Sequence, residues 1–270
     1  MNDEKSSEGE HLQAARIKTP KPAVPCNTHL MHIGILQADR VDPEHRARFG
    51  DYPAMFADTL RDAMEQKATF EFFDVRRQRY PRSVDDCDGY LVTGSRASVY
   101  DHDPWIASLI GFMGELHDAR ARTVGICFGH QLMAQALGGA VGRAPGGWGV
   151  GVHVWAVVRH ESWMRPAKPE FRLLASHQDQ VETLPPGARL LASSTFCPHA
   201  AFAIGDHMLA LQGHPEFTKA YAEFLMHKRR PLLGAAFEPG MRSLHEPTDA
   251  GIIAGWIAGF LAGGGTQAHR

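Results

Sequence analysis

Between residues 31 and 127 the chain alternates short apolar runs with longer segments in which apolar residues recur every three or four positions. Short apolar runs are typical of strands buried on both faces, and the longer spacing is typical of helices that cover a sheet. The expected strands are MHIGILQA (31–38), ATFEFFDV (68–75), DGYLVTGS (88–95) and TVGIC (123–127). The expected helices span residues 52–66, 104–121 (with Asp103 as N-cap and Pro104 in the first turn) and 128–139. This alternation predicts an α/β fold with a mostly parallel sheet and helices on both faces.

The pattern changes from Ala140 to His214, where short strands are separated by turns rich in proline and glycine. These strands, among them VGVHVWAVV, ARLLASS and MLALQGH, predict antiparallel additions to the sheet. Two further helices are expected at residues 219–228 and 249–262. Residues 1–30 mix charges with prolines and have no period, which predicts a disordered N-terminal arm ahead of one domain over residues 31–270. An upstream extension is the alternative, because Met31 begins the first expected strand.

Composition excludes several classes of function. A net charge of -2 and scattered basic residues provide no patch for nucleic acid or for an anionic membrane. No apolar stretch reaches the roughly 18 residues of a membrane-spanning helix. The four cysteines are widely spaced without a CxxC pair, which favours the reducing cytoplasm over a disulfide framework or a zinc knuckle. Because H-E-x-x-H and phosphate-loop motifs are also missing, we expect a cytoplasmic protein with a small-molecule substrate and neither a cofactor nor a metal.

The segment GICFGHQLMAQALGG (residues 125–139) places Cys127 between Gly125 and Gly129, where an expected strand turns into an expected helix. A side chain at the tip of such an elbow is exposed to substrate, and glycines on both sides allow the tight turn. The helix N-terminus favours the thiolate, which is the nucleophilic form. Most free cysteines are simply small buried residues, but this setting favours a nucleophile.

A nucleophilic thiol needs a base, and the base needs a third group to orient it. His214 follows the apolar run MLALQG, and Glu216 comes two residues later. Residues i and i+2 of an extended chain point the same way, so the Glu216 carboxylate is expected to reach the imidazole. Considered without the elbow, the same residues would more simply form a polar surface turn.

Several segments of the chain resemble those of a known family. GICFGHQLMAQALGG followed by LQGHPEF resembles the signature pair of class I glutamine amidotransferase domains. LVTGSRASVYDHDPWI, GGWGVGVHV and SHQDQVETLPPGARLLASS resemble the stand-alone, GMP-synthase-like branch that includes plant γ-glutamyl peptidases, and the resemblance covers Met31 to Phe217. It implies a flavodoxin-like sheet and a triad in which Cys127 attacks glutamine or a γ-glutamyl amide, His214 relays protons and Glu216 orients His214. The intermediate would be a γ-glutamyl thioester.

The resemblance also implies further site residues. The backbone N–H groups of Gly94 and Phe128 would form the oxyanion hole, although the Gly94 loop reads TGSRAS where GMP synthetase has a doubled glycine and a proline. The candidate substrate-binding residues are Gln131, Trp148, His177 and Asp179. Each also has a structural interpretation, as a first-turn helix residue, a packing residue or part of a polar turn.

Several functions stay open at this level. The enzyme could be a glutaminase that supplies ammonia to a synthetase partner in trans, or a stand-alone hydrolase of γ-glutamyl peptides, conjugates or amines. The absence of a fused acceptor segment favours the second. A dienelactone-hydrolase-like esterase also uses a cysteine elbow, but its acid precedes the histidine in the chain, whereas Glu216 follows His214. A catalytically silent binding module with the same fold is the third alternative.

Overall fold

The computed structural model describes residues 30–64 and 68–263, so the predicted arm lies, except for Leu30, outside the described residues. The strands are β1 (Met31–Gln37), β2 (Ala68–Asp74), β3 (Gly89–Val92), β4 (Thr123–Ile126), β5 (Ala140–Arg143), β6 (Gly149–Val157), β7 (Glu170–His177), β8 (Asp179–Thr183), β9 (Ala188–Ser193), β10 (Ala201–Ile204) and β11 (Met208–Leu211). The α-helices are α1 (Pro43–Phe49), α2 (Tyr52–Ala63), α3 (Pro104–Asp118), α4 (Phe128–Ala136), α5 (Lys219–Lys228), α6 (Arg230–Leu233), α7 (Phe237–Ser243) and α8 (Ala250–Leu261).

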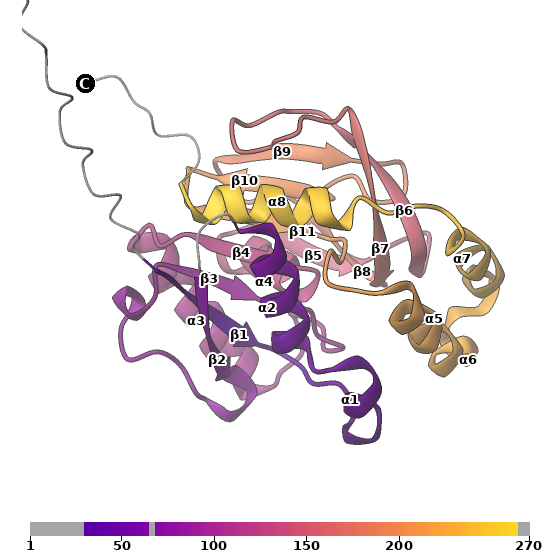
Figure 1. Cartoon of the computed structure of the whole chain (residues 1–270), viewed down its shortest axis with the longest axis horizontal. Coiled ribbons are helices and arrows are strands. Elements are labelled where there is room, and N and C mark those ends of the chain that lie inside the picture. The colour runs from indigo at the N-terminus through magenta and orange to yellow at the C-terminus, as the bar shows by residue number, and fades with distance from the viewer. Residues whose placement is uncertain (1–29, 65–67, 264–270) are drawn as a thin grey trace, which may run out of the picture.

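One large mixed sheet runs through the molecule in the order β2-β1-β3-β4-β11-β10-β9-β6-β7 (Figure 1). The first five strands are mutually parallel, and the last four add antiparallel pairings. The predicted α/β architecture with antiparallel additions is confirmed, and the parallel half has a flavodoxin-like strand order. β11, expected among the antiparallel additions, pairs antiparallel with β10 as predicted. Its other neighbour is β4, to which it is parallel, with Leu211 beside Ile126.

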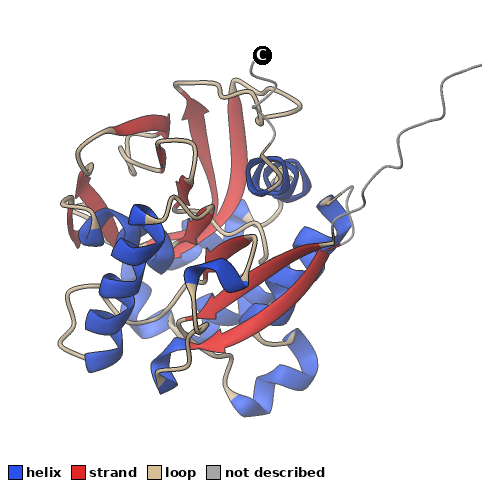
Figure 2. Cartoon of the chain, turned by 90° about the vertical axis from the view of Figure 1, so that its left-hand side faces the viewer, coloured by secondary structure: helices blue, strands red, loops and turns tan. Residues whose placement is uncertain are grey.

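The parallel strands β1, β3 and β4 are buried on both faces, whereas the edge strand β2 is partly exposed. Ile33 and Ile35 of β1 belong to a core with residues of α2 and α8, whereas Tyr90 and Val92 of β3 belong to a second core with residues of α3 and α4. Figure 2 shows helices on both sides of the strands. Burial on both faces explains why these strands are continuous apolar runs in the sequence.

The predicted helices are present, but their ends differ. α2 ends at Ala63 and α3 at Asp118, a few residues earlier than the periodicity indicates. Asp103 occupies the N-cap position of α3, but its side chain makes no capping hydrogen bond. Three short helices do not follow from the sequence pattern: α1, and α6 and α7 between the two expected C-terminal helices. No helix in the described part of the chain is both long and apolar enough to cross a membrane.

Candidate active site

Cys127 stands at a sharp turn between β4 and α4. Its φ of 53° and ψ of -100° lie in a region that residues with a side chain rarely adopt. A Cβ on Gly125 would lie 2.3 Å from the Gly129 carbonyl oxygen, and a Cβ on Gly129 would lie 2.5 Å from the Val92 carbonyl oxygen. Only glycine fits on either side of the cysteine, so the elbow predicted from the sequence is formed by local backbone packing.

The sheet order brings Cys127 and His214 together from distant parts of the chain. β4 and β11 are neighbours, and the Cys127 N–H donates to the Leu211 carbonyl oxygen at 2.9 Å. The His214 N–H donates to the Leu174 carbonyl oxygen at 2.8 Å, which ties the histidine to β7. A Cβ on Gly94, just beyond β3, would lie 3.0 Å from His214 Cε1 and 3.6 Å from Cys127 Cβ. The carboxyl ends of β3, β4 and β11 therefore bring Gly94, Cys127 and His214 together.

His214 and Glu216 form a buried pair. The His214 Nδ1–H donates to Glu216 Oε1 at 2.8 Å, and the imidazole stacks on the Phe217 ring at a centroid distance of 3.9 Å. Nε2 is buried without a hydrogen-bond partner among the described residues, which leaves it available to the Cys127 thiol. Burial alone lowers the pKa of His214, but the negative charge of Glu216, helped by Cys127, outweighs it and raises the pKa to about 10.

Two backbone N–H groups next to the cysteine, those of Phe128 and Gly94, have no hydrogen-bond partner among the described residues. The N–H of Phe128 lies at the start of α4, where N–H groups have no partner within the helix. The Gly94 loop is anchored to the loop after β1: the Ala38 N–H donates to Thr93 Oγ1 at 3.0 Å, and the Arg96 N–H donates to Asp39 Oδ2 at 3.0 Å. Unpaired, firmly held donors of this kind suit a developing oxyanion.

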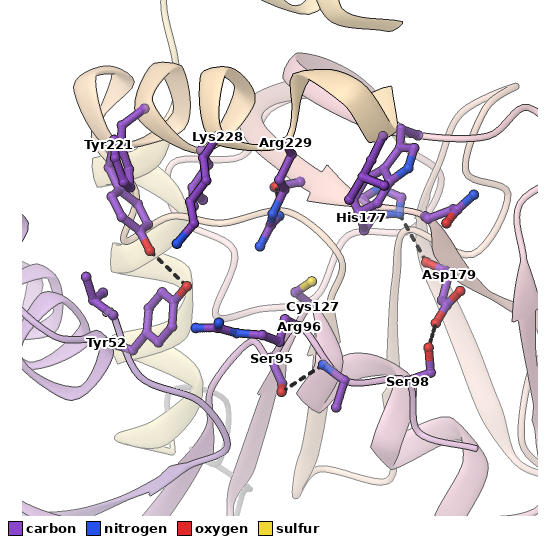
Figure 3. A pocket seen from close by; sticks show the side chains of 18 of the residues that line it. Tyr52, Ser95, Arg96, Ser98, Cys127, His177, Asp179, Tyr221, Lys228 and Arg229 are labelled. Carbon is purple, nitrogen blue, oxygen red and sulfur yellow. Dashed lines mark hydrogen bonds between the residues drawn. The ribbon is translucent and has the colours of Figure 1, made fainter. Parts of the chain in front are cut away.

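A cavity of about 370 Å³ opens above the Cys127 sulfur, between the strand ends and α5 (Figure 3). The four candidate substrate-binding residues all line it: Gln131, Trp148, His177 and Asp179. Other lining residues include Tyr52, Ser95, Arg96, Ser98, Ser176, Tyr221, Lys228 and Arg229. The sequence segments that resemble the family's substrate site are therefore brought to one cavity.

Two of these four residues already use their polar groups within the protein. Gln131 is buried, and its amide donates to the Asp179 carbonyl oxygen at 2.8 Å and to Gln212 Oε1 at 3.1 Å. The Asp179 carboxylate accepts the hydroxyls of Ser98 at 2.5 Å and Tyr100 at 2.9 Å. The interpretation of Gln131 as an exposed first-turn residue is therefore wrong, and Asp179 holds the cavity wall together.

His177 is a neutral imidazole. Burial, reinforced by the nearby His153, lowers the pKa of His177 to about 3. Because a carbonyl oxygen can only accept, the His177 Nδ1–H donates to the Asp179 carbonyl oxygen at 3.1 Å, and Nε2 carries the free lone pair. Nε2 has no partner among the described residues, so it is an unused acceptor in the wall of the cavity.

Basic residues that were not predicted from the sequence also line the cavity. Lys228 pairs with Asp42, and Arg96 pairs with Asp39 and Asp42, so both cations have carboxylate partners. Arg229 differs: its guanidinium donates to Ser176 Oγ at 2.8 Å, lies 5.8 Å from the centre of the Trp148 ring, and has no carboxylate within ion-pair distance in the described part of the chain. Figure 3 shows the Arg229 side chain directed into the cavity that holds Cys127.

Comparison with known proteins places this fold and site in a family. The family model "Glutamine amidotransferase class-I" matches residues 56–228. The chain belongs to this family. It is 33% identical to γ-glutamyl peptidase 3 of Arabidopsis thaliana over 179 residues, covering 63% of this chain and 71% of that protein. It is 29% identical to a glutamine amidotransferase-like protein of Schizosaccharomyces pombe over 244 residues, covering 85% of this chain and 98% of that protein.

The fold of the chain also matches that of a solved glutamine amidotransferase structure. A glutamine amidotransferase from Thermotoga maritima superposes with a TM-score of 0.66 at 20% identity, covering 86% of this chain and 99% of that one. Family membership supports a cysteine-dependent amidohydrolase. These comparisons lend no support to a dienelactone-hydrolase-like esterase or to a silent binding module.

Proposed function

We propose that the protein hydrolyses glutamine or a γ-glutamyl amide through a γ-glutamyl thioester on Cys127, with His214 and Glu216 completing the triad. The observation that carries the proposal is the buried 2.8 Å hydrogen bond from His214 to Glu216, next to a cysteine at a strained strand-to-helix elbow. A nucleophile, a base and a group that orients the base are the parts that covalent amide hydrolysis requires.

Before attack, the proton of the Cys127 thiol passes to His214 Nε2, where the raised pKa of His214 holds it at neutral pH. In the first step, the resulting thiolate attacks the γ-carbonyl carbon of the substrate. The negative charge that develops on the carbonyl oxygen is stabilised by the N–H groups of Phe128 and Gly94. Loss of one such donor typically costs about 2.7 to 4 kcal/mol of transition-state stabilisation. Glu216 keeps the proton of His214 on Nδ1 and stabilises the imidazolium that forms.

In the second step, the C–N bond breaks, and His214 returns its proton to the leaving amine. The γ-glutamyl group stays on the Cys127 sulfur as a thioester. Water then enters, gives a proton to His214 Nε2 and attacks the thioester, which releases glutamate and restores the thiol. The raised pKa of His214 suits its role as the acid, because the imidazolium stays protonated at neutral pH until the leaving group takes the proton.

The charge of the cavity favours a substrate with an anionic leaving group over free glutamine. Arg229 presents a guanidinium that has no carboxylate partner among the described residues, and guanidinium groups bind carboxylates through paired hydrogen bonds. The ammonia released from glutamine carries no negative charge, whereas the amine released from a γ-glutamyl amino acid carries a carboxylate. We therefore favour γ-glutamyl peptides or conjugates over a glutaminase that feeds a synthetase in trans.

The test compares purified protein with its Cys127→Ala variant on glutamine and on γ-glutamyl dipeptides, measuring released glutamate. We expect the wild type to turn over the dipeptides faster than glutamine and the variant to turn over neither. Absence of turnover of both substrate classes by the wild type would contradict the proposed activity. Turnover of glutamine alone would instead favour ammonia supply to a synthetase.

We also propose that residues 31–270 act as one domain and that the protein works in the cytoplasm. In support, a single sheet joins the first and last strands of the described chain, and Cys87, Cys127 and Cys197 are all free thiols. Free thiols are typical of reducing compartments. The proposed partner is a small γ-glutamyl molecule, with no nucleic acid or membrane involved and no cofactor in the reaction.

A further inference from the structure

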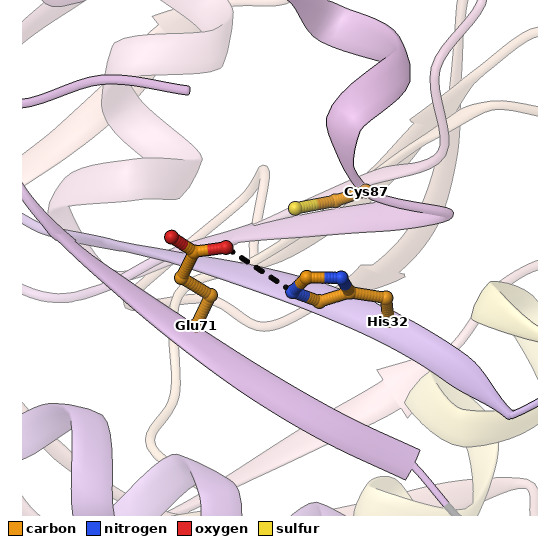
Figure 4. Close-up of side chains that lie close together, drawn as sticks. All are labelled: His32, Glu71 and Cys87. Carbon is orange, nitrogen blue, oxygen red and sulfur yellow. Dashed lines mark ion pairs between the residues drawn. The ribbon is translucent and has the colours of Figure 1, made fainter. Parts of the chain in front are cut away.

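Three side chains of different chemistry converge at the end of the sheet opposite Cys127. His32 is the second residue of β1, Glu71 lies on β2, and Cys87 precedes β3 (Figure 4). A ring nitrogen of His32, a Glu71 carboxylate oxygen and Cys87 Sγ all lie within 4.8 Å of one another. Because the parallel strands begin at this edge, the cluster is separate from the catalytic centre at their carboxyl ends.

The backbone fixes two of these residues relative to each other. The His32 N–H donates to Asp88 Oδ2 at 2.7 Å, and the Asp88 N–H donates back to the His32 carbonyl oxygen at 2.8 Å. This reciprocal pair holds the segment that carries Cys87 against the start of β1. These two hydrogen bonds therefore hold the side chains of His32 and Cys87 close to each other.

The third residue is placed by strand register. Glu71 on β2 lies opposite Gly34 on β1, which has no side chain to block the space between the strands. A Cβ on Gly34 would lie 2.8 Å from the Tyr90 ring and 3.0 Å from Cys87 Sγ, so the glycine leaves room for both. A larger residue at position 34 would displace the Tyr90 ring or the Cys87 sulfur.

We propose that His32, Glu71 and Cys87 form a binding site for Zn²⁺ or a similar divalent transition metal. Zinc takes imidazole nitrogen and carboxylate oxygen at about 2.0–2.1 Å, which in tetrahedral geometry puts these two atoms about 3.3 Å apart. His32 Nε2 and Glu71 Oε2 are 3.3 Å apart. A thiolate and a carboxylate together balance the charge of the ion, and the partly exposed His32 and Glu71 side chains leave the fourth position to water.

Binding exchanges a proton for the metal. Burial raises the pKa of Cys87 to about 11, so the thiol is protonated at neutral pH without metal. The S–H bond breaks as the Zn–S bond forms, and the proton leaves to solvent, while His32 binds through the neutral lone pair of Nε2. The bound ion would join the edge strand β2 to β1 and to the start of β3, so we expect an effect on stability rather than on catalysis.

The experiment titrates the purified full-length protein with Co²⁺, which takes zinc sites and gives a visible thiolate charge-transfer absorption. We expect a saturable band that Zn²⁺ displaces, at one ion per chain, in the wild type and in Cys127→Ala. His32→Ala and Cys87→Ala should bind at least about tenfold more weakly, because even an outer-shell partner is worth 10- to 100-fold in metal affinity.

A second measurement distinguishes loss of the metal site from loss of folding in the variants. Added Zn²⁺ should raise the melting temperature of the wild type and of Cys127→Ala, but not of Cys87→Ala, whereas γ-glutamyl turnover of Cys87→Ala should equal that of the wild type. A band that survives in Cys87→Ala, or one that disappears in Cys127→Ala, would overturn the assignment. So would the absence of saturable binding, which would leave His32 and Glu71 as an ordinary ion pair.

Discussion

The carboxylate of Glu216 reaches the reaction only through His214. Both side chains are buried, and the hydrogen bond between them sets which imidazole nitrogen carries the proton. Glu216→Gln keeps the shape but removes the charge. We expect kcat to fall by about 10²- to 10⁴-fold, the range typical of removing a group that orients a catalytic histidine. Unchanged turnover of a γ-glutamyl dipeptide by the folded variant would show that Glu216 has no such role.

Arg229 provides the test of leaving-group charge. Arg229→Gln should lower kcat/KM for a γ-glutamyl amino acid by about tenfold, the equivalent of about 1.4 kcal/mol, because the substrate carboxylate loses its guanidinium partner. Turnover of glutamine should change much less. The matched control is Lys228→Gln, because Lys228 already pairs with Asp42. Equal losses on the two substrates would contradict selection of the leaving group by Arg229.

Some of the candidate site could be predicted from single residues. Cys127 and the pair His214 and Glu216 follow local rules, glycine spacing at an elbow and alternation along an extended segment. Arg229 could not be found in this way, because its importance depends on α5 lying over the cavity. The hydrogen bonds from Ser98 and Tyr100 to the Asp179 carboxylate could not be predicted either, because those two residues lie in a loop about 80 positions earlier in the chain.

At the scale of elements, the elbow depends on close contact between backbones. Gly129→Ala would place a Cβ 2.5 Å from the Val92 carbonyl oxygen, so α4 would have to move away from β3. We expect the free energy of unfolding to fall by about 1–3 kcal/mol, as for other overpacked sites, and turnover to fall as Cys127 shifts. Chemical denaturation of both proteins measures the first effect.

The matched control is Gly111→Ala on α3, where an added Cβ meets nothing within 4 Å. Replacing a glycine inside a helix by alanine is expected to stabilise the protein by about 0.5–1 kcal/mol. If the two alanine variants were equally stable, steric crowding would not be the reason for glycine at position 129.

The elements themselves were predictable to different degrees. Apolar strands and periodic helices in the first half follow from burial on two faces of a sheet, and they lie where the pattern indicates. The parallel pairing of β11 with β4 could not be predicted, because its apolar run is the same whether its neighbour is parallel or antiparallel. Short helices such as α6 span too few residues for a periodic pattern to appear.

At the scale of the whole molecule, the protonation of His214 links the active site to stability. The pKa of His214 in the folded protein is about 10, above the ordinary value of about 6.5, so the folded state holds this proton more tightly than the unfolded chain. The resulting stabilisation is fully present below about pH 6.5 and is lost as the pH rises through about 10.

This linkage can be measured by denaturation of the wild type and Glu216→Gln at several pH values. Because Glu216 is the main group that raises the pKa of His214, the wild type should exceed the variant in stability most at about pH 6, and the difference should shrink toward about pH 10. A difference that does not depend on pH would mean that His214 is not held as an imidazolium by Glu216.

The central claim is that the γ-glutamyl group passes through a covalent bond to Cys127. The most direct test mixes the enzyme with a γ-glutamyl dipeptide, quenches the reaction in acid within the first turnover, and measures the mass of the intact protein and of the peptide that contains Cys127. We predict a mass increase of one γ-glutamyl group on Cys127 in the wild type and none in Cys127→Ala. Turnover without any such adduct, or an adduct on another residue, would contradict the account.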